Sequence, residues 1–104
     1  MTVFNWELIE VFCARLGMRA TKAFDQWLQK VERMQWKTFQ DIRQTFANHA
    51  DPYKGESGAA YVIFDVGGNK YRLVARVYYE DERVVVVNVM THDVYDRQHW
   101  KEGL

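Results

Sequence analysis

The hydrophobic pattern of this chain changes its period near the middle, and this change constrains the fold more than any other feature. From Asn5 to Phe46, apolar residues recur every three or four positions, as in amphipathic helices. From Tyr61 to Met90 they alternate or run on among β-branched residues, which is typical of strands. With 104 residues, the chain has the size of one domain, so we expect a single α+β domain over residues 1–104.

The first helix is predicted between Asn5, a suitable N-cap, and Gly17, which ends it. Its apolar side chains at helical spacing are Leu8, Val11, Phe12 and Leu16. Residues 2–4 either add an edge strand to the sheet or lead directly into this helix. The sequence leaves both alternatives open.

Two further helices complete the first half. The second carries the clearest apolar stripe, over residues 20–34. The third begins near a capping box formed by Thr38 and Asp41 and ends before Pro52. Residues 51–58 contain this proline and two glycines, so we predict a loop that leads into a new layer.

Three strands follow, and we predict them at 61–66, 70–80 and 84–90. Gly67 and Gly68 form a two-residue turn between the first two, because adjacent glycines adopt positive φ without strain. A three-residue loop, 81–83, joins the second strand to the third. Thr91 caps a short closing helix through residue 96 or 97. The predicted fold is α+β, with N-terminal helices on one face of an antiparallel sheet of three to four strands.

The first turn sets which side chains share the face away from the helices. It places Asp65 opposite Lys70. Lys70, Arg72 and Arg76 all point to this face, at intervals of roughly 6.7 Å and twice that. Such a row follows a phosphate backbone well. The plain alternative is a solvated face on which Lys70 pairs with Asp65.

The second loop sets the register of the last strand. It keeps one set of valines inside, namely Val85, Val87 and Val89. It also places Asn88 beside Arg76 and, if pairing continues past the strand end, His92 beside Arg72. Two aromatic rings, Tyr61 and Tyr78, share this face and are suited to stacking on unpaired bases.

His92 is the candidate proton-transfer residue. An imidazole exchanges a proton near neutral pH, and the adjacent Arg72 guanidinium would stabilise a phosphorane-like anion. One alternative is a histidine that hydrogen-bonds locally at a helix start. Another is a metal site with Asp96 and His99, although one short helix would supply every ligand. Cys13 is expected to be a buried thiol rather than a nucleophile.

Charge and composition exclude several protein classes. Fourteen basic and fourteen acidic residues cancel, so bulk charge does not bind nucleic acid, and any such binding is local. The longest aliphatic run, 84–87, is four residues long, whereas a membrane-spanning helix needs roughly 20. The amino terminus lacks a secretory pattern and there is one cysteine, so we expect a cytoplasmic protein with no membrane partner.

Three segments resemble the HigB toxins of type II toxin-antitoxin systems. They are Trp27 with Trp36-Lys37-Thr38 and Phe46, then Gly67-Gly68-Asn69-Lys70-Tyr71-Arg72-Leu73-Val74, and finally Thr91-His92-Asp93-Val94-Tyr95-Asp96. The resemblance extends from about Arg19 to Asp96. It implies a RelE-like fold whose open sheet face cleaves messenger RNA in the ribosomal decoding site. It further implies a metal-independent endoribonuclease without a cofactor, in which the ribose 2′-hydroxyl is the nucleophile.

The resemblance also implies residue roles and partners. Arg72, His92 and Tyr95 lie inside matching motifs and are the implied catalytic residues, with the order of base and acid left open. The residues expected to bind RNA follow from strand parity and not from the resemblance, and they are Lys70, Arg76, Tyr78, Tyr61 and Asn88. The implied partners are the ribosome, messenger RNA and a HigA-like helix-turn-helix antitoxin. DNA is contacted only through this antitoxin. The alternative function is a non-catalytic RelE-like module that binds RNA, the ribosome or a protein.

Overall fold

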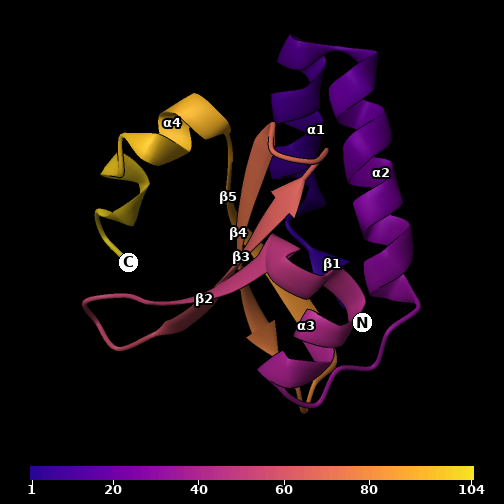
Figure 1. Cartoon of the computed structure of the whole chain (residues 1–104), viewed down its shortest axis with the longest axis vertical. Helices are drawn as coiled ribbons and strands as arrows, with labels where there is room; N and C mark the ends of the chain where they lie inside the picture. Colours follow the sequence, from indigo (N-terminus) through magenta and orange to yellow (C-terminus); the bar gives the residue numbers. More distant parts are fainter.

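The computed structural model describes residues 1–104 and shows a five-stranded sheet with helices against it (Figure 1). The helices are α1 (Trp6–Leu16), α2 (Met18–Glu32), α3 (Phe39–Phe46) and α4 (His92–Asp96), with 3-10 turns η1 (Ala47–His49) and η2 (His99–Lys101). The strands are β1 (Thr2–Phe4), β2 (Ala50–Lys54), β3 (Ala60–Val66), β4 (Tyr71–Tyr78) and β5 (Arg83–Thr91). None of the helices has the length and apolar character needed to cross a bilayer.

The sheet has the order β1-β5-β4-β3-β2. Strand β1 pairs with β5 in parallel, and the other neighbours are antiparallel. The predicted α+β, RelE-like architecture is confirmed, but the sheet is mixed and has five strands. Residues 2–4 add the edge strand that the sequence left open.

The other edge strand, β2, occupies residues that the sequence predicts to be a loop. Residues 50–54 pair with β3, and Pro52 lies opposite Val62. A proline is compatible with this position because an edge strand leaves one side of its backbone without a ladder partner. The loop proper is limited to residues 55–59.

The helix-side core forms around α2 and α3, as predicted. Phe24, Trp27 and Val31 of α2 are buried. The Trp27 ring meets the Phe64 ring of β3 edge to face at 5.3 Å, and Phe46 of α3 meets Phe64 at the same distance. The Thr38–Asp41 capping box is also present. The strongest apolar stripe therefore fixes where the helices meet the sheet.

Helix α1 turns a different face to this core than the one predicted. Ile9 and Cys13 are buried, whereas Leu8 and Val11 are 42% and 63% exposed. Asn5 occupies the N-cap position, as predicted, but its side chain makes no capping hydrogen bond, and its Nδ2 donates to the Val86 carbonyl at 3.1 Å. This bond ties the start of α1 to β5 and sets which face of the helix meets the sheet.

The β3–β4 hairpin is wider than the predicted two-residue turn. Asp65 pairs with Arg72 rather than with Lys70, and four residues connect the strands. Gly67 and Gly68 do have the positive φ expected of them, at 66° and 69°. Because the register shifts by two residues, every side chain of β3 and β4 keeps its predicted face.

The β4–β5 pairing contains a bulge at Val87. On the hairpin side of the bulge, Val84 and Val86 are fully buried against the helices, so the prediction that placed Val85 and Val87 inside is wrong. Beyond the bulge the alternation reverses, and Val89 packs on the helix-side core as predicted. The bulge thus decides which side chains near the end of β5 face away from the helices.

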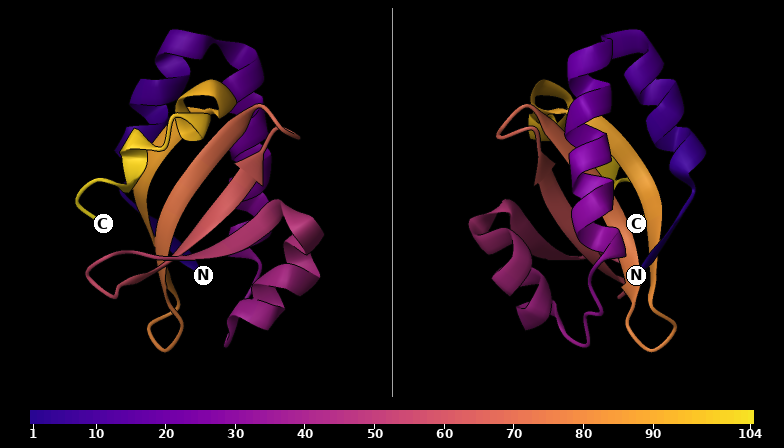
Figure 2. Two further views of the ribbon diagram at one scale, coloured as in Figure 1. Left: turned by 60° about the vertical axis from the view of Figure 1, so that its left-hand side comes forward. Right: turned by 90° about the vertical axis from the view of Figure 1, so that its right-hand side faces the viewer.

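The C-terminal segment lies on the face of the sheet opposite α1 and α2 (Figure 2). Trp100 of η2 is buried in a second, smaller cluster with Ile63, Val74 and Met90. Its indole N–H donates to the Tyr95 carbonyl at 2.9 Å. The face that the sequence predicts to be open is therefore partly covered.

Candidate functional site

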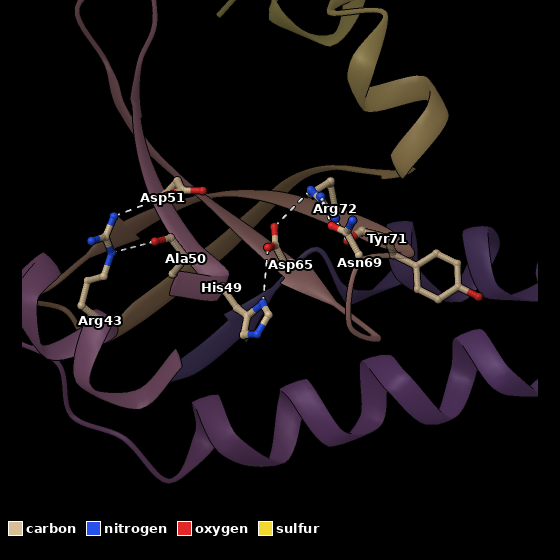
Figure 3. Close-up of polar contacts among 8 residues, drawn as sticks. All are labelled: Arg43, His49, Ala50, Asp51, Asp65, Asn69, Tyr71 and Arg72. Atoms are coloured by element: carbon tan, nitrogen blue, oxygen red, sulfur yellow. Dashed lines mark hydrogen bonds and ion pairs between the residues drawn. The ribbon is translucent and has the colours of Figure 1, made fainter. Parts of the chain in front are cut away.

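A chain of polar contacts joins His49, at the end of η1, to β3 and β4 (Figure 3). Asp65 of β3 lies opposite Arg72 of β4, and its Oδ1 is 3.1 Å from Arg72 Nε. The other carboxylate oxygen, Oδ2, is 3.4 Å from Nδ1 of His49, the residue before β2. Asp65 therefore links an arginine to a histidine.

Arg72 is the one polar or charged residue among the buried residues, with 7% exposure. Its Nη1 donates to the Tyr71 carbonyl at 3.1 Å, and its Nη2 donates to Asn69 Oδ1. The guanidinium carbon lies 5.2 Å from the centroid of the Tyr95 ring. A buried guanidinium with a carboxylate and two neutral acceptors is held in one orientation, and it fixes the Asp65 carboxylate in turn.

His49 connects this chain of contacts to a cleft. The cleft has a volume of about 340 Å³ and lies between α2, η1 and the β3–β4 loop, with His49, Asp65 and Lys30 among its lining residues. The His49 side chain is 54% exposed. Because Nδ1 faces Asp65, the second ring nitrogen points away from the carboxylate (Figure 3). This arrangement suits proton exchange through Nε2.

The predicted register requires His92 to lie beside Arg72, but the structure does not bring the two residues together. Met90 occupies that position, because the hairpin closes at Tyr78 and Arg83, earlier than predicted. The His92 backbone N–H instead donates to the Lys70 carbonyl at 2.9 Å, where α4 begins.

The His92 ring interacts within its own helix. Its Nδ1 is 3.0 Å from Asp96 Oδ2, although the two atoms are not aligned as a hydrogen bond. The His92 side chain is 38% exposed and the Asp96 side chain 60%. A second histidine–carboxylate pair thus exists at the end of β5, and its carboxylate is more open than that of the His49 pair.

Tyr95 is the predicted catalytic side chain that does contact Arg72. Its ring stacks on Trp100 with 5.1 Å between centroids and 13° between planes. Burial raises the pKa of the Tyr95 phenol above its ordinary value of 10.0, the Arg72 guanidinium lowers it, and nearby carboxylates raise it further. The phenol is therefore neutral at physiological pH and donates a proton or hydrogen bond rather than accepting a proton.

Arg76 is the free guanidinium on this face. Its guanidinium carbon lies 5.1 Å from the Tyr78 ring and 5.8 Å from the Tyr61 ring. Arg72 and Arg83 are paired with carboxylates, but Arg76 forms no ion pair and its buried Nε has no hydrogen-bond partner. A phosphate would supply the missing acceptor.

The aromatic side chains beside Arg76 differ in exposure. Tyr78 is 37% exposed, and its ring is open to a base. Tyr61 is only 8% exposed and belongs to the cluster under Trp100, so the structure does not place its ring at the surface as predicted. Tyr61 instead supports the Arg76 guanidinium from below.

Lys70 and Asn88 are exposed but do not extend the row of arginines. Lys70 lies in the β3–β4 loop, because β4 begins one residue later. Asn88 pairs with Val74 rather than lying beside Arg76, and its Oδ1 accepts a hydrogen bond from its neighbour's backbone N–H at 2.8 Å. The basic row is therefore shorter than predicted.

Two further chemistries weighed from the sequence have a clear structural outcome. Cys13 is buried, and burial raises the pKa of its thiol above 9.0 against the lowering effect of a hydrogen bond with Thr21. The predicted burial of this thiol is confirmed. His99 faces Glu102 at 3.5 Å, and no three potential metal ligands of the chain gather in one place.

His49 and Asp65 are the site residues that the sequence analysis did not single out. The predicted register places Asp65 opposite Lys70, and the predicted loop at residues 51–58 follows His49. A usable signal was present, because an antiparallel strand at 50–54 places His49 next to the position opposite Asp65. Pro52 obscured that strand.

Comparison with known proteins relates the chain to one family. Residues 20–98 match the family model of HigB_toxin, described as the RelE-like toxic component of a toxin-antitoxin system. A segment of 36 residues is 44% identical to the mRNA interferase toxin HigB of Escherichia coli (strain K12), covering 35% of each chain. The identity and coverage are the same for proteins named mRNA interferase HigB from Escherichia coli O157:H7 and Shigella flexneri. These alignments span about a third of the length of the curated relatives.

Proposed function

We propose a function from one premise: the chain belongs to the HigB family of RelE-like toxins. The proposed function is cleavage of messenger RNA on the ribosome, which arrests translation until a HigA-like helix-turn-helix antitoxin neutralises the toxin. The matched residues include all of β3, β4, β5 and α4, the elements that carry the site. The matched relatives are named mRNA interferases, which supports RNA as the substrate.

The observation that carries the proposal is the surroundings of Arg72. This buried guanidinium touches a neutral phenol on one side and, through Asp65, a histidine on the other. Transfer of a phosphodiester to the 2′-hydroxyl needs a base, an acid and a fixed positive charge near the phosphate. A fixed positive charge and a neutral proton donor meet at this one side chain, and a histidine lies beyond the Asp65 carboxylate.

Among the residues predicted to be catalytic, His92 and Tyr95 are the proposed proton carriers. Both retain some exposure, and the Tyr95 phenol is neutral at physiological pH. Arg72 acts from beneath Tyr95, because it is buried and holds both Asp65 and the Tyr95 ring. It is thus proposed as a positioning residue that also supplies positive charge.

Arg76 and Tyr78 are the proposed main RNA contacts, with Lys70 and Asn88 at the margins. An unpaired guanidinium beside an exposed ring suits one phosphate and one unstacked base. So short a basic row gives little affinity on its own, and the formal net charge is zero. The ribosome would supply the missing affinity by holding the message in place.

The test is to incubate the purified chain with translating ribosomes and to sequence the ends of the message. New 5′ ends inside the ribosome-bound message are expected with the wild-type chain. His92→Ala and Arg72→Ala are expected to relieve growth arrest in cells, with circular dichroism to establish folding. Folded variants at both positions that remain fully toxic would refute these roles. Intact message together with retained ribosome binding would favour the non-catalytic binding module.

The antitoxin is tested separately. We expect a short helix-turn-helix protein to be encoded beside this chain and to co-purify with it. Co-expression should restore growth, and DNA binding should require the partner. A toxic chain that no neighbouring product neutralises would argue against a toxin-antitoxin pair.

A further inference from the structure

The cleft beside His49 contains chemistry that the proposed roles of His92 and Tyr95 leave unused. His49 reaches it from η1, and the Asp65 carboxylate lies behind the ring at 3.4 Å. Asp65 is only 17% exposed and is fixed by Arg72. The carboxylate therefore selects the tautomer and orientation of the imidazole, as the aspartate does in a catalytic triad.

The other lining residues suit an anionic ligand that accepts hydrogen bonds. Lys30 of α2 forms no ion pair, and its ammonium lies 5.8 Å from the Phe46 ring. Trp27 is 3% exposed, and its indole N–H has no hydrogen-bond partner. A volume of about 340 Å³ lies within the range of small-ligand sites. A cation, an unsatisfied donor and a histidine thus line one nucleotide-sized cleft.

We propose that His49, oriented by Asp65, is the base that activates the ribose 2′-hydroxyl, and that the nucleotide bearing this hydroxyl lies in the cleft. The inference rests on the proposed function. Nε2 of neutral His49 takes the 2′-proton, the 2′-oxygen forms a bond to phosphorus, and the bond from phosphorus to the 5′-oxygen breaks. The 5′-oxygen takes a proton from the acid of the site, for which His92 and Tyr95 are the candidates. The products are a 2′,3′-cyclic phosphate and a 5′-hydroxyl.

The charges around His49 favour this role. Asp65 of β3 faces Nδ1 and stabilises the imidazolium that forms. Lys30 of α2 lines the same cleft and forms no ion pair, so its charge is available to the phosphate. Arg72 of β4 faces Asp65 from the far side, so it holds the carboxylate without touching the ring.

The test measures single-turnover cleavage of ribosome-bound message across pH. His49→Ala is expected to lower the rate by about 10²- to 10⁴-fold, the usual contribution of a general base. Ribosome binding, measured by co-sedimentation, should remain unchanged. His99→Ala is the matched control, because His99 is a histidine with a 79% exposed side chain in η2, and it should cleave at the wild-type rate.

The pH profile separates a proton-transfer role from a structural one. With the wild-type chain, the rate should rise with pH as the base loses its proton and then level off. The residual rate of His49→Ala should lose this rise. Asp65→Asn keeps the shape of the side chain but removes its charge, and because it leaves His49 in place the rise should persist.

The outcomes distinguish this inference from the proposed function. If the wild-type chain cleaves the message and folded His49→Ala cleaves equally well, His49 is not the base and the proposed function stands. If the cleavage rate of His49→Ala still rises with pH as the wild-type rate does, the base is again another group. If the wild-type chain leaves ribosome-bound message intact, the proposed function fails and this inference fails with it.

Discussion

The two histidine–carboxylate pairs of this chain differ in what holds the carboxylate. In the His92–Asp96 pair the atoms are closer, at 3.0 Å against 3.4 Å for His49–Asp65. Yet Asp96 is 60% exposed on a five-residue helix, whereas Asp65 is 17% exposed on a paired strand and bound to Arg72.

The shorter distance is therefore not the firmer contact. An exposed ion pair contributes little, because two mobile side chains must be ordered against water. A carboxylate fixed by a buried guanidinium orients its histidine whether or not substrate is present, and such a supporting contact is what a proton-transfer group needs. The comparison favours the His49 pair as the preorganised one.

The largest difference is expected in stability. Asp65→Ala leaves the buried Arg72 guanidinium without its carboxylate, so the free energy of unfolding should fall by about 3 kcal/mol. Asp96→Ala removes an exposed partner and should change it by about 0.5 kcal/mol or less. Urea unfolding of both variants measures the two values. Equal losses would break the distinction between the pairs.

A tenfold effect is expected at the free arginine. Arg76→Ala should weaken binding to the messenger RNA on ribosomes by about tenfold, the equivalent of one charge-assisted hydrogen bond. Arg83→Ala is the matched control, because Arg83 is already paired with Asp81 at 2.8 Å. Co-sedimentation with programmed ribosomes compares them. If the paired arginine matters more than the free one, the assignment of the phosphate contact is wrong.

A smaller loss of stability, confined to the segment that carries the His92–Asp96 pair, is expected from a substitution at Trp100. Trp100→Phe keeps a ring in the second cluster but removes the hydrogen bond to the Tyr95 carbonyl, at a cost of about 1 kcal/mol. Amide hydrogen exchange should accelerate over residues 92–104, while β3 and β4 keep their protection. Faster exchange at Asp65 and Arg72 would show that the two pairs are coupled.

The smallest effect concerns alkaline pH. The pKa of Tyr95 is raised on folding, chiefly by burial, so the folded state keeps this proton where the unfolded state loses it. The resulting stabilisation is complete below the unfolded value near 10 and disappears as pH rises through the folded value. Tyr95→Phe should flatten the alkaline decline in stability, followed by denaturant unfolding at rising pH. A decline equal to that of the wild-type chain would contradict the raised pKa.

The sequence predicted those parts of the fold that depend on local pattern. The stripe of α2, the capping box of α3 and the three central strands were all readable, because periodicity and caps are local signals. The faces of Arg72 and Arg76 were also right, since a two-residue slip preserves alternation. The family resemblance also rests on local motifs, chiefly in β4 and α4.

The rest depended on contacts between distant segments. Nothing near Asn5 in the sequence shows that its side chain bonds to Val86 and rotates α1. Pro52 reads as a loop signal until an edge position makes it acceptable. The link from His49 to Asp65 needs that hidden strand, so the better-supported pair was the one that sequence reasoning overlooked.

The bulge at Val87 reverses the side-chain alternation of the β5 residues that follow it. Because one additional residue inverts the alternation, the carboxyl end of β5 delivers α4, and with it Tyr95, to the surface opposite α1 and α2. Deletion of Val87 would therefore turn the side chains of residues 88–91 to the opposite face of the sheet. One additional residue in β5 therefore decides which side chains at the end of this strand share a face with Arg72.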